Sequence, residues 1–576
     1  MNMGSFPKGG RRSIDPITAE VLRYQMLAIA KQVDVNITKT AYSPLIYEYK
    51  DYAVGLVDHR GRLIAQGGGS APVFVANALG VAVQDGLLVL GEDAIEAGDI
   101  ILTNHSGTLG QHLNNVVAYM PIFTGGPEPR IFAYMACVVH WLDIGGTAVG
   151  SCTAPHATDI FQEGVQFRHM KLWSRGKADK GAYATIEANT RMPLELMGDI
   201  EAQVAGCLYG RDLFRTMLDK YGEDEVRQAI DIMWEASEAA ARAVVSSIPD
   251  GTYRAESLLD CDPAKPGVPI PIRVAVTVAG NTLNVDFAGS APQAVGPINS
   301  GKEGGSVAAA RIAFKYLVSR EHSANFGTFA PLSVSIPDGT FLSAHAQAPM
   351  GGYSSALPTV IDTILKAMVP VLPEQLAGGH HGAMEGVRIS GVHPETGQLF
   401  LHIDTCLGGW GALSGTDGPG AYKTMVHGDT LEVPIESVER AYPLRVEHYE
   451  IRPDSGGPGE YRGSNGVEKV FLALAPCELT LLLDRTACPP WGVMGGQDGR
   501  PTIASIERGP QRIAEAVTQD VVRLAAGDRL RMKTAGGGGY GNPALRKRDL
   551  VERDLAGGYI SRSAAATDYG VVPEGR

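Results

Sequence analysis

The sequence predicts an α+β fold with large mixed or antiparallel sheets, a helical hairpin and several lobes. Three observations support this prediction. The 576 residues exceed what one ordinary hydrophobic core serves. Strand-like apolar runs, such as residues 52–66 and 131–140, occur beside long segments with helical periodicity. The 71 glycines indicate many turns and close backbone approaches.

The chain divides into four approximate regions, which could also form one continuous fold. Residues 1–180 are rich in predicted strands and open with a long amphipathic helix, for which Asp15 and Pro16 supply the N-terminal signals. Residues 181–250 predict a helical hairpin, broken at Gly222. Residues 251–400 predict an α/β middle region, and residues 401–576 a β-rich C-terminal region.

Composition limits the classes of partner. The formal net charge of -13 argues against general binding of nucleic acid or acidic lipid, which require basic surfaces. No apolar segment is as long as a membrane span, and the N-terminal residues lack the apolar core of a signal peptide. Seven cysteines without CxxC spacing are typical of reduced, buried thiols. We therefore expect a cytoplasmic protein that acts on a small molecule.

The stretch CVVHWLDIGG places His140 and Asp143 at the end of an apolar run. On a regular strand these positions point to opposite faces, but the following Gly145-Gly146 indicates a turn that could bring the side chains together. An imidazole and a carboxylate, joined by a third ligand and an open position, are typical of a catalytic divalent metal site. The alternative, favoured by the residues alone, is a hydrogen-bonded core histidine and an aspartate that caps the turn.

Nine motifs, in order, carry a family resemblance that covers nearly the whole chain. They are DPITAEV, TAYSPLIYEYKDYAVGLVD, GDIILTN with GQHLNNV, HWLDIGG, FQEG, DFAGSAPQAVGPIN, PLRVEHYEIRPDSGGPGEYRG, DRTACPPWG and TAGGGGYGNP. This set resembles the hydantoinase B family, the B-type subunits of hydantoinases and oxoprolinases. Substrates vary widely inside the family, so the fold does not identify the substrate.

The resemblance implies an ATP-dependent pair of subunits. The A-type partner, in a hetero-oligomer with this chain, would bind ATP and magnesium and phosphorylate a carbonyl-derived oxygen, and the B-type subunit would complete the reaction. It also implies a divalent metal (zinc, manganese or iron) held by His140, Asp143 and a later histidine. His169 is the candidate third ligand and His156 its substitute, although many relatives have two prolines where Arg168 and His169 stand.

Further site residues follow from the resemblance and from residue type. Relatives carry acids near residue 105 and where this chain has Asn115, so an acid-base role here would fall on His105 or His112, with His112 preferred. Glu48 and Asp51 in YEYKDY are candidate acid-base groups. Ser70 and Tyr353 lie beside glycines and could bind substrate. Glu163 is a possible hydrogen-bond partner of a metal-bound histidine. Each could instead be purely structural.

The sequence therefore predicts a subunit of an ATP-dependent hydrolase acting on a cyclic amide such as a hydantoin, a lactam or 5-oxoproline. A metal ion at His140, Asp143 and His169 would activate the attacking water. Two alternatives remain open: the metal-containing subunit of an ATP-dependent ketone carboxylase, of the acetone or acetophenone type, and a non-catalytic scaffold subunit.

Overall fold

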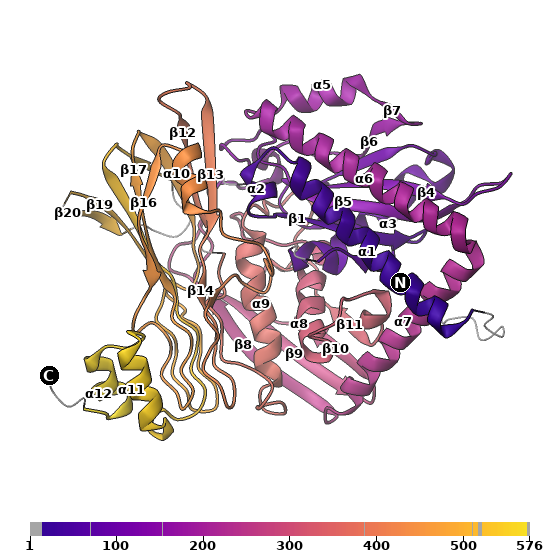
Figure 1. The fold of residues 1–576 in the computed structure, drawn as a ribbon. Helices are drawn as coiled ribbons and strands as arrows, with labels where there is room; N and C mark the ends of the chain where they lie inside the picture. Colours follow the sequence, from indigo (N-terminus) through magenta and orange to yellow (C-terminus); the bar gives the residue numbers. More distant parts are fainter. Residues whose placement is uncertain are drawn as a thin grey trace.

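A computed structural model describes residues 14–68, 71–152, 154–384, 386–509, 511–515 and 521–572. Its combination of helices with several largely antiparallel sheets confirms the α+β prediction. Figure 1 shows helices α1 and α6 lying across the N-terminal sheet, the middle sheet below them, and a C-terminal part of strands and long loops to one side. In the described part of the chain, no helix is both long and apolar enough to cross a membrane.

The N-terminal sheet has seven strands in the order β2-β1-β5-β4-β3-β6-β7, and neighbouring strands are antiparallel. The strands are β1 (Tyr52–Asp58), β2 (Leu63–Gln66), β3 (Ile100–Thr103), β4 (Asn115–Phe123), β5 (Ile131–His140), β6 (Arg168–Ser174) and β7 (Lys177–Ala178). Every residue of the central strand β5 is buried. Its alternate side chains enter two different hydrophobic cores, as the two-residue period of a strand requires. His140 is therefore the last residue of a rigid, fully covered strand.

Long helices cover one face of this sheet. The predicted first helix is α1 (Pro16–Thr40), whose first turn is capped by Asp15 accepting a hydrogen bond from the Thr18 N–H. The two helices predicted within residues 181–250 are α6 (Pro193–Tyr221) and α7 (Glu223–Ser246), which are separated by Gly222 at φ 84°. Helix α6 packs on α1, β4 and β5. Shorter helices complete this part: α2 (Pro44–Tyr47), α3 (Leu79–Leu90), α4 (Ser106–Leu109) and α5 (Lys180–Ala188).

The middle part contains a four-stranded sheet in the order β11-β10-β9-β8, in which only β10 and β11 are parallel. Its strands are β8 (Gly251–Leu259), β9 (Ile270–Ala279), β10 (Thr282–Asp286) and β11 (Leu332–Ser335). Helix α9 (Tyr353–Met368) packs on β8, β9 and helix α8 (Ala308–Val318). All but one residue of α9 is buried, so the start of this helix is a fixed point of the interior.

The C-terminal part contains two larger sheets that enclose a third core, and a two-stranded ribbon. One sheet has the order β13-β12-β18-β21 and the other β16-β17-β22-β19-β20. The strands are β12 (Gly386–Val392), β13 (Leu399–Thr405), β14 (Gly408–Gly409), β15 (Ala421–Tyr422), β16 (Leu444–Ile451), β17 (Val467–Ala473), β18 (Cys477–Leu482), β19 (Ile503–Arg508), β20 (Gln511–Glu515), β21 (Val521–Leu524) and β22 (Asp528–Lys533). The helices are α10 (Ile435–Ala441), α11 (Arg548–Ala556) and α12 (Arg562–Tyr569).

The run of glycines at 536–539 forms an extended segment between other chain segments. Gly538 donates to the Gly379 carbonyl at 2.8 Å, and its own carbonyl accepts from the Ala412 N–H at 2.9 Å. Backbone atoms lie so close on these sides that a Cβ at any of the four positions would overlap them. Glycine is required here by the close approach of neighbouring backbones.

Candidate metal centre

His140 ends β5 with its side chain in a buried cavity. The residue is 4% exposed, and its Nδ1 has no hydrogen-bond partner among the described residues. Its Nε2 lies 3.9 Å from the Sγ of Cys152. The His112 ring meets it edge-on, with 4.9 Å between the ring centroids. A buried imidazole nitrogen without a partner is costly unless something binds it, so His140 is a candidate ligand.

Neighbouring polar contacts hold the other two candidate ligands in place. His112 lies three residues before Asn115, with 2.9 Å between its Nε2 and the Asn115 Oδ1, and its Nδ1 lies 3.3 Å from the Gly351 carbonyl oxygen. Asn114 ties Cys152 to the strand end, because its Oδ1 accepts from the Cys152 N–H while its Nδ2 donates to the Trp141 carbonyl.

One ligand atom from each of His112, His140 and Cys152 lies within 4.8 Å of the others, close enough for a shared cation.

Burial sets the protonation of these groups. Burial, the nearby His112 and the Arg388 charge hold the pKa of His140 well below its usual value. Burial also lowers the pKa of His112 to about 4. Both rings are therefore neutral near pH 7, which is the form that binds metals. Burial raises the pKa of the Cys152 thiol, so a cation must displace its proton. The donor set fits a divalent metal.

The cavity around these groups is small, with a volume of about 30 Å³. Asp51 and Tyr353, two of the residues expected from the sequence, line it together with His112 and His140. Burial raises the pKa of Asp51 to about 6, although the positive charges around it oppose this effect. Tyr353 begins α9, and its hydroxyl oxygen accepts a hydrogen bond of 2.9 Å from the Asn115 Nδ2. The structure thus brings Asp51, His112, His140 and Tyr353 together.

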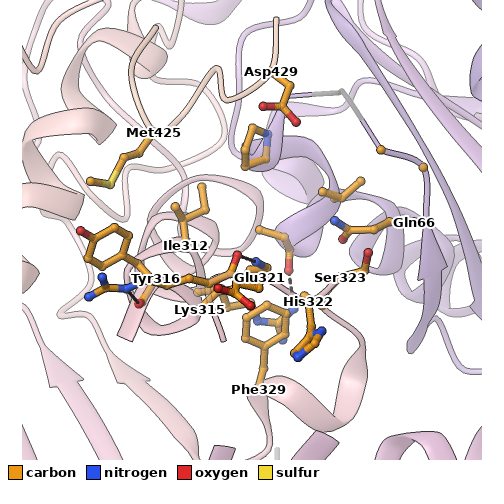
Figure 2. A pocket seen from close by; sticks show the side chains of 18 residues that line it. Gln66, Ile312, Lys315, Tyr316, Glu321, His322, Ser323, Phe329, Met425 and Asp429 are labelled. Atoms are coloured by element: carbon orange, nitrogen blue, oxygen red, sulfur yellow. Dashed lines mark hydrogen bonds between the residues drawn. The ribbon is translucent and has the colours of Figure 1, made fainter. Parts of the chain in front are cut away.

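A larger chamber of about 500 Å³ lies next to this cavity. Figure 2 shows Met425 and Asp429 above Lys315, Tyr316 and Phe329 in this chamber. Two segments, residues 71–76 and 425–429, contribute lining residues to both spaces, so the two spaces adjoin at these segments. A backbone hydrogen bond joins these segments, from the Val73 N–H to the Val426 carbonyl, and it is long at 3.5 Å. The chamber is large enough for a small ring, whereas the cavity holds only a small group.

Asp143 has protein partners on both of its carboxylate oxygens. Its carboxylate is fully buried and accepts hydrogen bonds from the Gly145 and Gly150 N–H groups, at 3.2 and 2.9 Å, and from Arg191. The salt bridge to the Arg191 Nη2 measures 2.9 Å. With these donors around it, Asp143 holds the loop between His140 and Cys152, and it is not part of the group of ligand atoms.

His169 also lies outside that group. It occupies β6 at φ 56°, where its Nε2 lies 2.7 Å from the Asp85 Oδ2 and its Nδ1 3.0 Å from the Tyr119 hydroxyl. Its ring nitrogens thus face Asp85 and Tyr119, and His169 is not in the group of ligand atoms around His140. His156, the substitute ligand, is exposed, and His105 contacts Thr108 at 3.0 Å.

The remaining predicted residues have different positions. Glu48 is half-buried and accepts a hydrogen bond of 3.4 Å from the Ser437 hydroxyl, and it does not line the cavity. Ser70 lies outside the described residues. Glu163 accepts from the N–H groups of Met350 and Gly351 at 2.8 and 2.7 Å, and thereby positions the carbonyl that faces His112.

Three residues of the site have no counterpart among the sequence predictions: Arg388 and His427, which line the cavity, and Cys152, which lies beside His140. His427 is buried on the 425–429 segment, and burial lowers its pKa to about 3. Arg388 lies on β12, more than 200 residues from His140 along the chain. A sequence pattern can mark a histidine near a glycine turn, but it does not reveal which distant strand faces that histidine.

Comparison with known proteins places this geometry in a family. The family model for hydantoinase B/oxoprolinase matches residues 15–543. The chain belongs to the hydantoinase B/oxoprolinase family. It is 30% identical to the B-type subunit of a putative D-/L-hydantoinase from Pseudomonas sp. (strain NS671), over 97% of this chain and 96% of that protein.

Structural similarity agrees with this assignment. The crystal structure of the ATP-dependent caprolactamase from Pseudomonas jessenii matches with a TM-score of 0.90 and 25% identity, covering 98% of this chain and 97% of that one. A nucleotide-free acetone carboxylase structure matches with a TM-score of 0.86 and 18% identity, covering 97% of this chain and 80% of that one. The acetone carboxylase match shows a shared fold. The family resemblance seen in the sequence motifs is therefore confirmed.

Proposed function

We propose that this chain is the B-type subunit of an ATP-dependent enzyme that hydrolyses a cyclic amide. The observation that carries the proposal is the cavity lined by Asp51, His112 and His140, with the Cys152 thiol beside His140, next to a chamber of about 500 Å³. The similarity to caprolactamase over nearly the full length of both chains supports a lactam-like ring as the substrate class. An A-type partner would bind ATP and magnesium and phosphorylate the amide oxygen, and the pair would work in the cytoplasm.

The residues that would hold a cation are His112, His140 and Cys152. Imidazole and thiolate ligands suit zinc or iron better than manganese. When bound, such a cation supplies Lewis-acid polarisation of a carbonyl or phosphoryl oxygen. Asn114 and Gly351 keep the ligands in place, and Asp143 keeps the connecting loop in place, without contacting the cation themselves.

Asp51 is the proposed general base. Because its pKa is raised to about 6, the carboxylate is ionised near pH 7 yet basic enough to take a proton from an attacking water. Tyr353 is the proposed donor to the phosphorylated amide oxygen of the substrate. Its oxygen already accepts from Asn115, so its O–H hydrogen is available for another acceptor. Burial of both groups excludes bulk water and strengthens their interactions with a substrate.

The test is to purify the chain with its A-type partner and measure ADP release and ring opening with lactams, hydantoins and 5-oxoproline, and separately with ketones plus bicarbonate. We expect hydrolysis without bicarbonate. Asp51→Asn should lower turnover by about 10²–10⁴-fold, the usual contribution of a general base. His345→Ala, a change at an exposed histidine outside the cavity, is the matched control. Strict dependence of turnover on bicarbonate would instead indicate a ketone carboxylase. If the A-type partner is equally active in the absence of this chain, the chain is a non-catalytic scaffold subunit.

A further inference from the structure

Arg388 is a buried arginine that lacks the partners such a side chain normally has. It lies on β12, between Ile403 of β13 and Thr480 of β18, and the residue is 3% exposed. Its Nε and Nη1 have no hydrogen-bond partner among the described residues. Its Nη2 donates to the Cys152 Sγ over a long 3.9 Å. The guanidinium lines the same cavity as His140.

Other buried arginines of this chain are better compensated. Arg546 is held by Asp417 at 2.7 Å and by Asp554 at 2.6 Å. Arg485 also has nitrogens without hydrogen bonds, but it lies 3.7 Å from Asp362 and stacks at 4.8 Å over the Trp491 ring. A guanidinium stays charged at any pH that proteins experience, and burying a charge without a partner destabilises the folded state. Arg388 therefore requires an anion that the chain does not supply in full.

Among the described residues that line the cavity, none forms a hydrogen bond with this guanidinium. Asp51, the one carboxylate among these lining residues, interacts with Arg388 only through its charge and without a hydrogen bond. A guanidinium presents parallel N–H donors that match the two oxygens of a carboxylate or phosphate. The cavity volume of about 30 Å³ suits such a small end group, while a ring would remain in the adjoining chamber.

We infer that Arg388 binds an oxyanion carried by the substrate, so that the site takes anionic cyclic amides. This inference rests on the proposed function in taking the ligand to be a cyclic amide. The oxyanion has two sources with the same chemistry: a carboxylate on the ring, as in 5-oxoproline, or the phosphoryl group that the partner subunit adds. Arg388 is then a specificity residue, which selects charged over neutral rings or phosphorylated over unphosphorylated ones.

The experiment titrates the full-length, zinc-loaded chain with 5-oxoproline, with 2-pyrrolidinone, which is the same ring without the carboxylate, and with inorganic phosphate. Calorimetry and thermal unfolding report binding to the wild type, Arg388→Met and Arg388→Lys. If the ring carboxylate is the ligand, 5-oxoproline binds at least about tenfold more tightly than 2-pyrrolidinone, since a charge-assisted hydrogen bond contributes about 1.5–3 kcal/mol. If the phosphoryl group is the ligand, inorganic phosphate binds instead. Either preference disappears in Arg388→Met and is reduced in Arg388→Lys.

Ligand-free stability separates this role from a structural one. Because an unpaired buried charge is removed, Arg388→Met should unfold at the same or a higher temperature than the wild type. A lower unfolding temperature for Arg388→Met, or equal anion binding by wild type and variant, would overturn the inference. These outcomes are independent of hydrolysis. If the enzyme hydrolyses neutral lactams but binds no anion, the proposed function holds and this inference fails. If anions bind through Arg388 but no cyclic amide is hydrolysed, the anion site holds and the proposed function fails.

Discussion

Asp143 offers the sharpest test of how the site is built. The sequence suggests a metal ligand, whereas in the structure its carboxylate holds the loop through Gly145, Gly150 and Arg191, a role that we call a clamp. In Asp143→Asn one carboxylate oxygen becomes an NH₂ group. If that is Oδ2, the N–H of Gly150 and the Arg191 guanidinium both face a donor in place of an acceptor. Hydrogen bonds to charged groups contribute about 1.5–3 kcal/mol each, and breaking a buried pair costs about 3–5 kcal/mol. Arg191 is 33% exposed and can be rehydrated, so we expect a loss of about 3 kcal/mol.

The assay combines urea unfolding, followed by tryptophan fluorescence, with metal content per folded chain. Arg191→Met is the matched variant, and the double variant completes a mutant cycle. A clamp predicts that both single variants are destabilised, that their effects are not additive, and that both still bind metal with weakened affinity. A ligand role predicts that only Asp143→Asn loses metal. If Asp143→Asn is as stable as the wild type but binds no metal, the clamp is refuted.

Three further predictions test the cavity, the packing and the charges. His140→Ala should abolish tight metal binding while circular dichroism and the unfolding temperature stay close to wild type; retention of one metal per chain would contradict the assigned ligand set. Gly537→Ala should prevent soluble folding, because its Cβ would overlap the Trp410 backbone, whereas Gly125→Ala, with open space around it, should express normally; equal yields would show that the glycine segment can shift. Burial and the nearby Asp260 raise the pKa of Asp484 from 3.8 to about 7, so the folded state retains a proton that the unfolded state loses. Unfolding free energy should fall by up to about 4 kcal/mol as pH rises from 4 to 7, and Asp484→Asn should remove this slope in urea unfolding at pH 5 and 7.5.

The elements that the sequence predicted well are those with strong local patterns. Helix α1 has an aspartate cap, a proline at its first turn and a regular apolar period, so its position depends little on the rest of the chain. The break between α6 and α7 falls at Gly222 because its positive φ favours glycine. Strand β5 was predicted from its apolar run. That its side chains alternate between two cores became clear only from the sheet, because the sequence does not show that both faces of the strand are covered.

The candidate site could be predicted only in part. His140 and Asp143 were expected to converge because glycines follow them, and the chain does turn there. The turn directs the carboxylate toward Gly150 and Arg191, and Arg191 lies 48 positions further along the chain. Cys152 and Arg388 carry no local signal, since a lone buried cysteine and an arginine within a strand are common in cores and sheets. Their function depends on contacts between distant segments, which one sequence does not display.

The order in which the cavity residues occur along the chain has a consequence for biosynthesis. His112, His140 and Cys152 leave the ribosome long before α9, Arg388 and His427, which later cover them. A cation can therefore reach its ligands on the unfinished chain, while the strands that enclose it are still being translated. In the finished protein the same ion would have to reach ligands that are buried. Protein produced under metal starvation would then recover its ion slowly, and most readily after partial unfolding.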